Sequence, residues 1–294
     1  MKNYDLLILG PATRDENVDY DGRTEYGVGG AVIFCAPAAR AANPNVFAAV
    51  KASPDDEADI RAALRMPEAD CAILPSRKTT YMYNRYYTAD RERRDAECRA
   101  QADAIAPAEL PGGIAWKLAH LAGLVRGDFS GELIRSLKAR GMLAADMQGF
   151  LRCNEGGRLT FHDWPEKLEY LPYFDILKTD AREAEVLTGL TDRAAAARQM
   201  HDWGAKEVMV SHNSEMLVFD GKTVRTCPVR ARNLSGRTGR GDTTFGAYLA
   251  MRLSGADIGE ALLYATACVS LKMETPGTFA GTRADVEAYI REFY

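Results

Sequence analysis

Short apolar runs alternate with amphipathic helical patterns along most of this 294-residue chain. The runs of strand length are residues 5–10, 46–50, 71–74, 115–121, 142–146, 175–178 and 207–211. The helical patterns are residues 31–42, 131–140, 181–187, 194–203, 243–253, 259–273 and 283–293. A strand followed by a helix is the repeating unit of a parallel sheet whose two faces are covered by helices. We therefore predict a three-layer α/β/α sandwich with a mostly parallel sheet.

Two segments interrupt this alternation and are predicted to project from the sheet. Residues 13–28 are polar and rich in Gly and Tyr, and residues 77–89 alternate in a β-like way and carry four tyrosines. Each follows a sheet strand, where loops build binding sites. An edge hairpin that binds no ligand is the alternative, because tyrosines are common in many strands. We predict one domain over residues 1–294 with a small β lid, which suits either a monomer or the clasp of a homodimer.

The composition is that of an ordinary soluble protein, with 47% hydrophobic residues, 27% charged residues and a formal net charge of −4. This balance argues against nucleic-acid binding. The charge run at residues 90–95 mixes both signs, which is typical of a solvated loop or helix face. Six scattered cysteines indicate neither a zinc site nor a disulfide framework, and no apolar run reaches the about 18 residues of a membrane span. We expect a cytoplasmic protein without membrane association.

A glycine-broken loop that runs into an apolar helix is the strongest chemical signal in the chain. It reads Gly239-Arg240-Gly241-Asp242. Free backbone N–H groups and the helix dipole make a helix start a phosphate cradle, and glycines let the backbone approach a bulky anion. Asp242 is poorly placed to hold phosphate but well placed to accept a proton from an attacking hydroxyl. Phosphoryl transfer to an alcohol is therefore indicated, although an Asp at a helix start is also a common cap.

Four short motifs follow one another along the chain: Asp15 after the first strand, Gly29-Gly30 before a helix, Asp180-Ala-Arg-Glu183 after a late strand, and the loop at 239–242. In type and order they resemble the signatures of the ribokinase (PfkB) family of carbohydrate kinases, and the resemblance runs nearly end to end. It implies an ATP- and Mg²⁺-dependent enzyme that phosphorylates a hydroxyl of a sugar or polyol.

The resemblance also assigns roles to individual positions. The backbone N–H groups of Gly239, Arg240 and Gly241 form the anion hole for the transferring phosphoryl group, and Asp242 takes the hydroxyl proton. The substrate-binding positions are Asp15, Asn17, Gly29, Gly30, Ile33, Tyr81, Tyr83, Gln148 and Arg152. The positions that bind the phosphoryl donor are Asp180, Glu183, Ser211, Asn213, Thr238, Gly239, Gly241 and Cys268. Asp180 and, through water, Glu183 are the expected Mg²⁺ contacts.

Some of these positions have a structural alternative. Asn17 suits turn formation equally well, and Glu183 would suit a solvent-facing helix position. The stretch from Asp146 to Arg152 looks like the Asp-x-Gln-Gly-(aromatic)-x-Arg run of an inositol-kinase-like branch of the family. Polar groups at the carboxyl end of a parallel strand belong in the ligand crevice, so Asp146, Gln148 and Arg152 are expected near the phosphates or the substrate. Local turn capping is the alternative for these three.

The chain departs from the family pattern at several positions. Arg240 stands where the family has Ala, and Asp180 stands in place of Asn. Gly236 replaces an Asp that commonly helps to bind a monovalent cation, so a role for such a cation is doubtful. The nucleotide-side loop, usually Gly-x-x-Gly, is residues 213–216, and Phe34 in place of an Asn argues against ribose.

Two other functions fit the same residues. Tyr81, Tyr83 and Phe34 could stack a base, which would make the chain a nucleoside kinase of the same fold. The altered donor-binding positions would suit a non-catalytic sugar-binding or regulatory protein, but a mere binder has no need of Asp242 in an anion hole. The chain lacks the Gly-x-x-x-x-Gly-Lys-Ser/Thr loop of P-loop proteins and a Gly-x-Gly-x-x-Gly turn after its first strand, which argues against both of those nucleotide folds.

Overall fold

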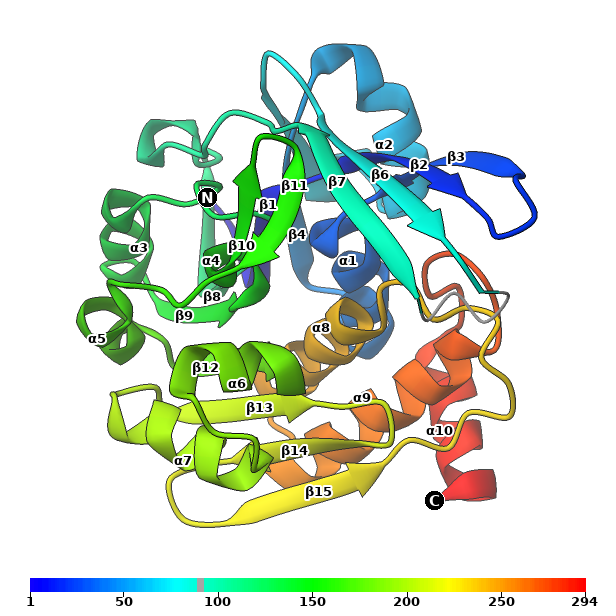
Figure 1. The fold of residues 1–294 in the computed structure, drawn as a ribbon. Helices are drawn as coiled ribbons and strands as arrows, with labels where there is room; N and C mark the ends of the chain where they lie inside the picture. Colours follow the sequence, from blue (N-terminus) through cyan, green and yellow to red (C-terminus); the bar gives the residue numbers. More distant parts are fainter. Residues whose placement is uncertain (89–92) are drawn as a thin grey trace.

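A nine-stranded sheet forms the centre of the protein in the computed structural model, which describes residues 1–88 and 93–294 (Figure 1). The strand order is β15-β14-β13-β12-β9-β8-β1-β4-β5. The strands span Lys2–Pro11 (β1), Val46–Ala52 (β4), Cys71–Pro75 (β5), Ile114–Leu121 (β8), Met142–Asp146 (β9), Ile176–Asp180 (β12), Glu207–Ser211 (β13), Glu215–Phe219 (β14) and Val224–Pro228 (β15). Neighbours from β13 to β5 pair in parallel, and β14 and β15 pair antiparallel at one edge. The predicted mostly parallel sheet is confirmed.

Helices cover both faces of this sheet because successive side chains of a strand point to opposite faces. In β1, Leu6 and Ile8 pack into one core, and Leu7 and Leu9 pack into the other. The first core is lined by α1 (Ala31–Ala42), α2 (Glu57–Leu64), α8 (Arg240–Leu253), α9 (Ile258–Met273) and α10 (Arg283–Phe293). The second is lined by α3 (Gly131–Lys138), α4 (Gln148–Leu151), α5 (Lys167–Tyr170), α6 (Ala181–Thr188) and α7 (Arg193–Asp202). The three-layer arrangement is therefore confirmed.

A second sheet, which we call the lid sheet, continues directly from the carboxyl end of β1 (Figure 1). Its order is β10-β11-β7-β6-β2-β3. The strands span Thr13–Val18 (β2), Thr24–Gly29 (β3), Thr80–Tyr86 (β6), Arg94–Ala100 (β7), Arg152–Glu155 (β10) and Arg158–Phe161 (β11). The predicted lid segments correspond to β2, β3 and β6, so the projecting lid is confirmed but is larger than expected.

Several details differ from the sequence prediction. The charge run at 90–95 was expected in a loop or helix, but Arg94 and Asp95 begin β7, and residues 90–92 lie outside the described part of the chain. Strand β7 is specified by pairing with β6, a contact that its own polar sequence does not reveal. The hairpin β14–β15 and helix α2 were also not predicted.

The described helices include none that is both long and apolar enough to cross a membrane. The six cysteines are all free thiols, and five of them are buried. Short 3-10 turns connect several elements, at Pro54–Asp56, Glu68–Asp70, Pro107–Glu109 and Leu171–Tyr173.

Candidate active site

The loop before α8 is shaped by two glycines that are needed for different reasons. Gly239 is the N-cap of α8 and has a φ of 74°, a conformation that residues with a side chain rarely adopt. A Cβ at Gly239 would also lie 2.1 Å from the ring of Phe34. Gly241 lies inside the first helical turn, where a Cβ would come within 2.8 Å of Lys178 Nζ. The loop therefore packs tightly on both sides, and of its backbone N–H groups that of Arg240 donates to the Arg237 carbonyl at 3.3 Å.

Asp242 follows these glycines on the first turn of α8 and is half-buried. Burial and the negative charge of Asp146 raise its pKa from 3.8 to about 6, against the opposing positive charges of Lys178, Arg152 and Lys272. A carboxylate with a pKa close to neutral can accept a proton at physiological pH. The position predicted to carry the base is thus surrounded by cations that also suit a phosphoryl group.

Beneath the loop lies a buried ion pair between Lys178 and Asp146, with 2.7 Å between Nζ and Oδ2. Asp146 ends β9 and Lys178 lies on the neighbouring strand β12. Burial alone would lower the pKa of Lys178, but Asp146, Glu183 and Asp242 together hold it above its ordinary value. Lys178 was not among the predicted site residues. Its signal in the sequence is a single charge within the otherwise apolar start of a buried strand.

Asp180 and Glu183 cap helix α6 by exchanging hydrogen bonds. The Glu183 N–H donates to Asp180 Oδ1 and the Asp180 N–H donates to Glu183 Oε2, each at 2.8 Å. Glu183 is only 3% exposed, which is contrary to the solvent-facing alternative. Burial raises its pKa to about 8, and Lys178 opposes this shift while Asp180 adds to it. The predicted metal contacts therefore also start the helix, and this structural role accounts for their spacing.

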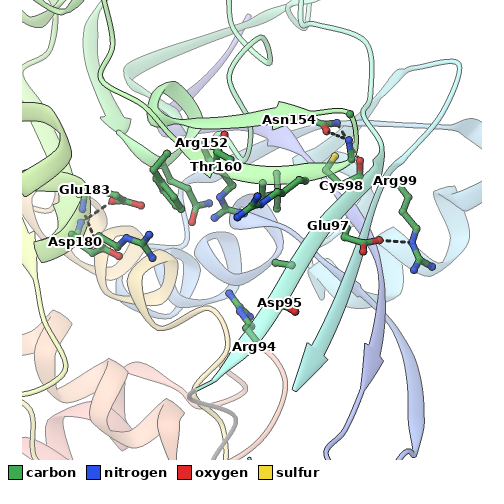
Figure 2. A pocket seen from close by; sticks show the side chains of 18 residues that line it. Arg94, Asp95, Glu97, Cys98, Arg99, Arg152, Asn154, Thr160, Asp180 and Glu183 are labelled. Atoms are coloured by element: carbon green, nitrogen blue, oxygen red, sulfur yellow. Dashed lines mark hydrogen bonds and ion pairs between the residues drawn. The ribbon is translucent and has the colours of Figure 1, made fainter. Parts of the chain in front are cut away.

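A cavity of about 1340 Å³ lies between the carboxyl ends of the main-sheet strands and the lid sheet (Figure 2). Four predicted residues line it: Gln148, Arg152, Asp180 and Glu183. Its walls also include arginines that were not predicted, namely Arg94, Arg99, Arg158 and Arg182. Figure 2 shows Asp180 and Glu183 on one side of this space, the β7 residues Glu97 and Arg99 on the other, and Arg152 of β10 between them. Such a concentration of guanidinium groups suits an anion with several charges.

A second cavity of about 470 Å³ lies beside β2, β3, β6 and α2, and Asp15 and Tyr81 line it. Burial raises the pKa of Asp15, opposed by Thr13 and by the charges of Arg94 and Arg152. A Cβ at Gly29 would lie 2.2 Å from Asp15 Oδ2, so the glycine leaves room for the carboxylate. Asp15 thus connects the lid sheet electrostatically with the arginines of the larger cavity.

The remaining predicted residues are spread over several environments. Gly30 has a φ of 109° and caps α1, and Ile33 and Cys268 are fully buried in the core. In the lid sheet, Asn17 accepts a hydrogen bond from Asn84, and the Tyr83 ring lies 3.7 Å below the Arg99 guanidinium.

The predicted donor-binding residues contact their neighbours near the loop before α8. The Ser211 hydroxyl donates to the Thr179 carbonyl. The Arg240 guanidinium donates to Asn213 in the β13–β14 turn, and the Thr238 carbonyl accepts from Lys272. Lys272 was not predicted, since it belongs to a helix with an apolar pattern.

A parallel sheet, a glycine-broken helix start and a cavity lined by arginines at the carboxyl ends of the strands together suit the binding of a small phosphorylated ligand, as a phosphotransferase requires. The chain belongs to the pfkB family of carbohydrate kinases, whose model matches residues 15–284. The family predicted from the sequence motifs is therefore confirmed.

Similar proteins support this assignment. A pyrophosphate-dependent kinase in the ribokinase family, solved with a pyrophosphate analog and myo-inositol, is 32% identical and covers 96% of this chain and 99% of its own, with a TM-score of 0.86. The cytidine kinase of Thermococcus kodakarensis is 26% identical over an alignment of 286 positions that covers 92% of this chain and 94% of that protein. The ribokinase of Arabidopsis thaliana, at 17% identity, covers 99% of each chain with a TM-score of 0.75 and shows the same fold.

Proposed function

We propose that this chain transfers a phosphoryl group from inorganic pyrophosphate to a hydroxyl group of a cyclic polyol, with Asp242 as the general base. The observation that carries the proposal is the half-buried Asp242 on the first turn of α8, directly after the Gly239–Gly241 loop. Its pKa of about 6 leaves it ionised at neutral pH and still basic enough to accept a hydroxyl proton. The proposal includes one domain of 294 residues in which the lid sheet covers the acceptor.

In the proposed reaction the acceptor hydroxyl gives its proton to Asp242 while its oxygen attacks one phosphorus of pyrophosphate. A new oxygen–phosphorus bond forms, the bridging bond of pyrophosphate breaks, and the bridging oxygen leaves with inorganic phosphate. Negative charge on the transferring group faces the N–H groups of Gly239 and Gly241 at the positive end of the α8 dipole, whereas the Arg240 N–H donates to the Arg237 carbonyl at 3.3 Å. Lys178, 2.8 Å from the Cβ position of Gly241, places a fixed positive charge behind the same loop.

Arg240 favours pyrophosphate over the ATP expected from the family resemblance. The resemblance assigns the β13–β14 turn to the nucleoside side of the donor, and the Arg240 guanidinium reaches across to Asn213 in that turn. A guanidinium there binds a second phosphate well but takes up space beside the loop that a nucleoside would use. The likeness to a pyrophosphate-dependent kinase at 32% identity supports the same donor.

Magnesium is proposed to bind through Glu183, with Asp180 beside it. Burial first, and then the charges of Asp180 and Asp146, raise the pKa of Glu183 to about 8 against the opposing charge of Lys178, and a divalent cation beside it would stabilise the ionised carboxylate. Magnesium usually takes one or two carboxylates together with phosphate oxygens, which this cavity wall allows. When bound, the ion neutralises part of the charge on the donor.

The acceptor is proposed to be a cyclic polyol of the myo-inositol type, held by Asp15 under the lid sheet. A nucleoside is the second candidate, and the likeness to a cytidine kinase favours it. However, two of the three aromatic rings that could stack a base, those of Phe34 and Tyr83, already pack on other groups. Phe34 packs against Gly239, Tyr83 stacks on Arg99, and the Tyr81 hydroxyl donates to Glu16 at 2.8 Å. These contacts favour the polyol.

The test is a matrix of donors and acceptors followed by ³¹P NMR, which detects each product phosphate. Pyrophosphate and ATP are combined with myo-inositol, other inositols, ribose and cytidine, each with Mg²⁺. We expect turnover with pyrophosphate and an inositol, and faster turnover than with ATP. Turnover only with cytidine would favour the nucleoside kinase, and binding without turnover of any pair would favour a non-catalytic protein.

The role of Arg240 has its own test. Arg240→Ala is expected to raise the KM for pyrophosphate on the order of tenfold, because a charge-assisted contact contributes about 1.5–3 kcal/mol. The ratio of ATP to pyrophosphate turnover should rise in the same variant. Arg291→Ala, at an exposed position of α10, is the matched control and should match the wild type. An unchanged KM in Arg240→Ala would refute the assignment of the donor contact.

A further inference from the structure

Lys272, near the end of α9, holds its ammonium group inside the protein rather than in water. The residue is only 2% exposed, and its Nζ donates to the backbone carbonyl oxygens of Gly236, at 2.5 Å, and of Thr238. It also lies 5.3 Å above the ring of Phe34. Burial lowers its pKa to about 8, and Asp242 opposes that shift. A lysine buried against two carbonyls is costly and calls for a function.

The segment held by Lys272 leads directly into the anion-hole loop. The Gly236 N–H donates to the Met273 carbonyl at 2.7 Å, so the segment is tied to the end of α9 from both sides. A Cβ at Gly236 would lie 1.9 Å from the Thr275 carbonyl oxygen, which leaves no room for a side chain. No carboxylate could therefore be supplied from this position. Instead, the ammonium group of Lys272 on α9 binds the carbonyl oxygens of this turn.

The bond to Thr238 sets the direction of a catalytic donor. A peptide group is planar and trans, so the carbonyl of one residue and the N–H of the next point in opposite directions. Because the Thr238 carbonyl points to Lys272, the Gly239 N–H points away from it. The Gly239 φ of 74° carries the chain from this peptide into α8. The ammonium group thus fixes the first peptide of the loop on which Asp242 also depends.

We propose that Lys272 is a positioning residue that acts as a tethered monovalent cation: its ammonium group binds the carbonyls of Gly236 and Thr238 and so orients the anion-hole loop. The reaction then needs no free monovalent cation. The role in turnover rests on the proposed function, whereas the cation role rests on the contacts alone. Lys272 does not contact the reacting atoms. Its ammonium group binds carbonyl oxygens, and it acts on the phosphoryl group by orienting the loop.

Two substitutions separate charge from packing. Lys272→Ala removes the ammonium group and leaves space for a small cation, while Lys272→Met fills that space without charge. Both variants, the wild type and the exposed control Lys222→Ala are assayed with pyrophosphate and myo-inositol in tetramethylammonium, potassium or ammonium chloride. We expect wild type and control to vary less than twofold among the salts. Both Lys272 variants should lose on the order of 100-fold in tetramethylammonium chloride, comparable to the loss of one anion-hole donor.

Potassium or ammonium should restore Lys272→Ala at least tenfold and should leave Lys272→Met unrestored. Full activity of Lys272→Met would show a packing role alone and overturn the proposal, as would a wild type that potassium activates tenfold. Failure of both cations to restore Lys272→Ala would also overturn it.

Thermal unfolding in the same salts decides the cation role even if the proposed reaction is wrong. Potassium or ammonium should raise the unfolding temperature of Lys272→Ala by several degrees relative to tetramethylammonium, because a ligand of the folded state stabilises it. Wild type and Lys272→Met should show no such difference. Equal responses of all three proteins would overturn the tethered cation.

Discussion

Replacing Asp242 by Asn is expected to lower activity strongly and, at the same time, to stabilise the fold at neutral and alkaline pH. Burial and the charge of Asp146 raise the pKa of Asp242 from 3.8 to about 6. A shift of about two units corresponds to about 3 kcal/mol that the ionised carboxylate costs the folded state. Because the side chain is half-buried, solvent screening reduces this figure to about 2 kcal/mol.

The sign of the pH dependence follows from the direction of this shift. The folded protein binds the Asp242 proton more tightly than the unfolded chain, so the group's contribution to stability is complete below pH 3.8 and is lost as the pH rises through about 6. Asn is neutral at every pH. The free energy of unfolding of Asp242→Asn should therefore exceed that of the wild type by about 2 kcal/mol at pH 8 and by less than about 1 kcal/mol at pH 4.5.

Urea unfolding of both proteins at the two pH values measures this difference, and turnover measured beside it should fall on the order of 10²–10⁴-fold. Asp202→Asn, at an exposed position in the last turn of α7, is the matched control and should change neither quantity. If Asp242→Asn were less stable than the wild type at pH 8, the surrounding cations would outweigh burial and the reasoning would fail. Unchanged turnover would refute the role as base.

Two further substitutions test the packing around the site. Gly241→Ala brings a Cβ within 2.8 Å of Lys178 Nζ, so steady-state kinetics should show a kcat lower by on the order of tenfold. The control is Gly112→Ala, whose added Cβ has no atom within 4 Å, and it should leave kcat unchanged. Tyr248→Phe removes the 2.6 Å hydrogen bond to the buried Glu207, and urea unfolding should show a loss of about 1–3 kcal/mol; no loss would contradict a structural role for this bond.

Much of the fold could be predicted because it rests on local patterns. Helix α1 begins and ends at the predicted residues Ala31 and Ala42, since its apolar face and the glycines before it are visible in the sequence. The buried strands were likewise visible as apolar runs. Strand β7 was missed because its residues are polar, and only pairing with β6 and β11 makes them a strand.

The predicted site residues likewise depend partly on local motifs and partly on tertiary contacts. Asp180 and Glu183 form a motif within four residues, and the structure places both on the cavity of about 1340 Å³. The motif nevertheless left open whether Glu183 faces solvent, and its burial depends on the elements packed against α6, among them α4, β12 and β13. A short motif thus identifies residue types at a helix start, whereas the exposure of each side chain depends on all the elements packed against it.

The sequence alone determined the sandwich, the family and the Gly239–Asp242 loop, because each depends on residues that are neighbours along the chain or on a regular period. The tertiary structure decided which charges surround that loop. Lys178 comes from β12 and Lys272 from α9, and neither belongs to a recognisable motif. Coulomb energy depends on distance in space and on burial, and folding brings these two cations to Asp242 from 64 and 30 residues away.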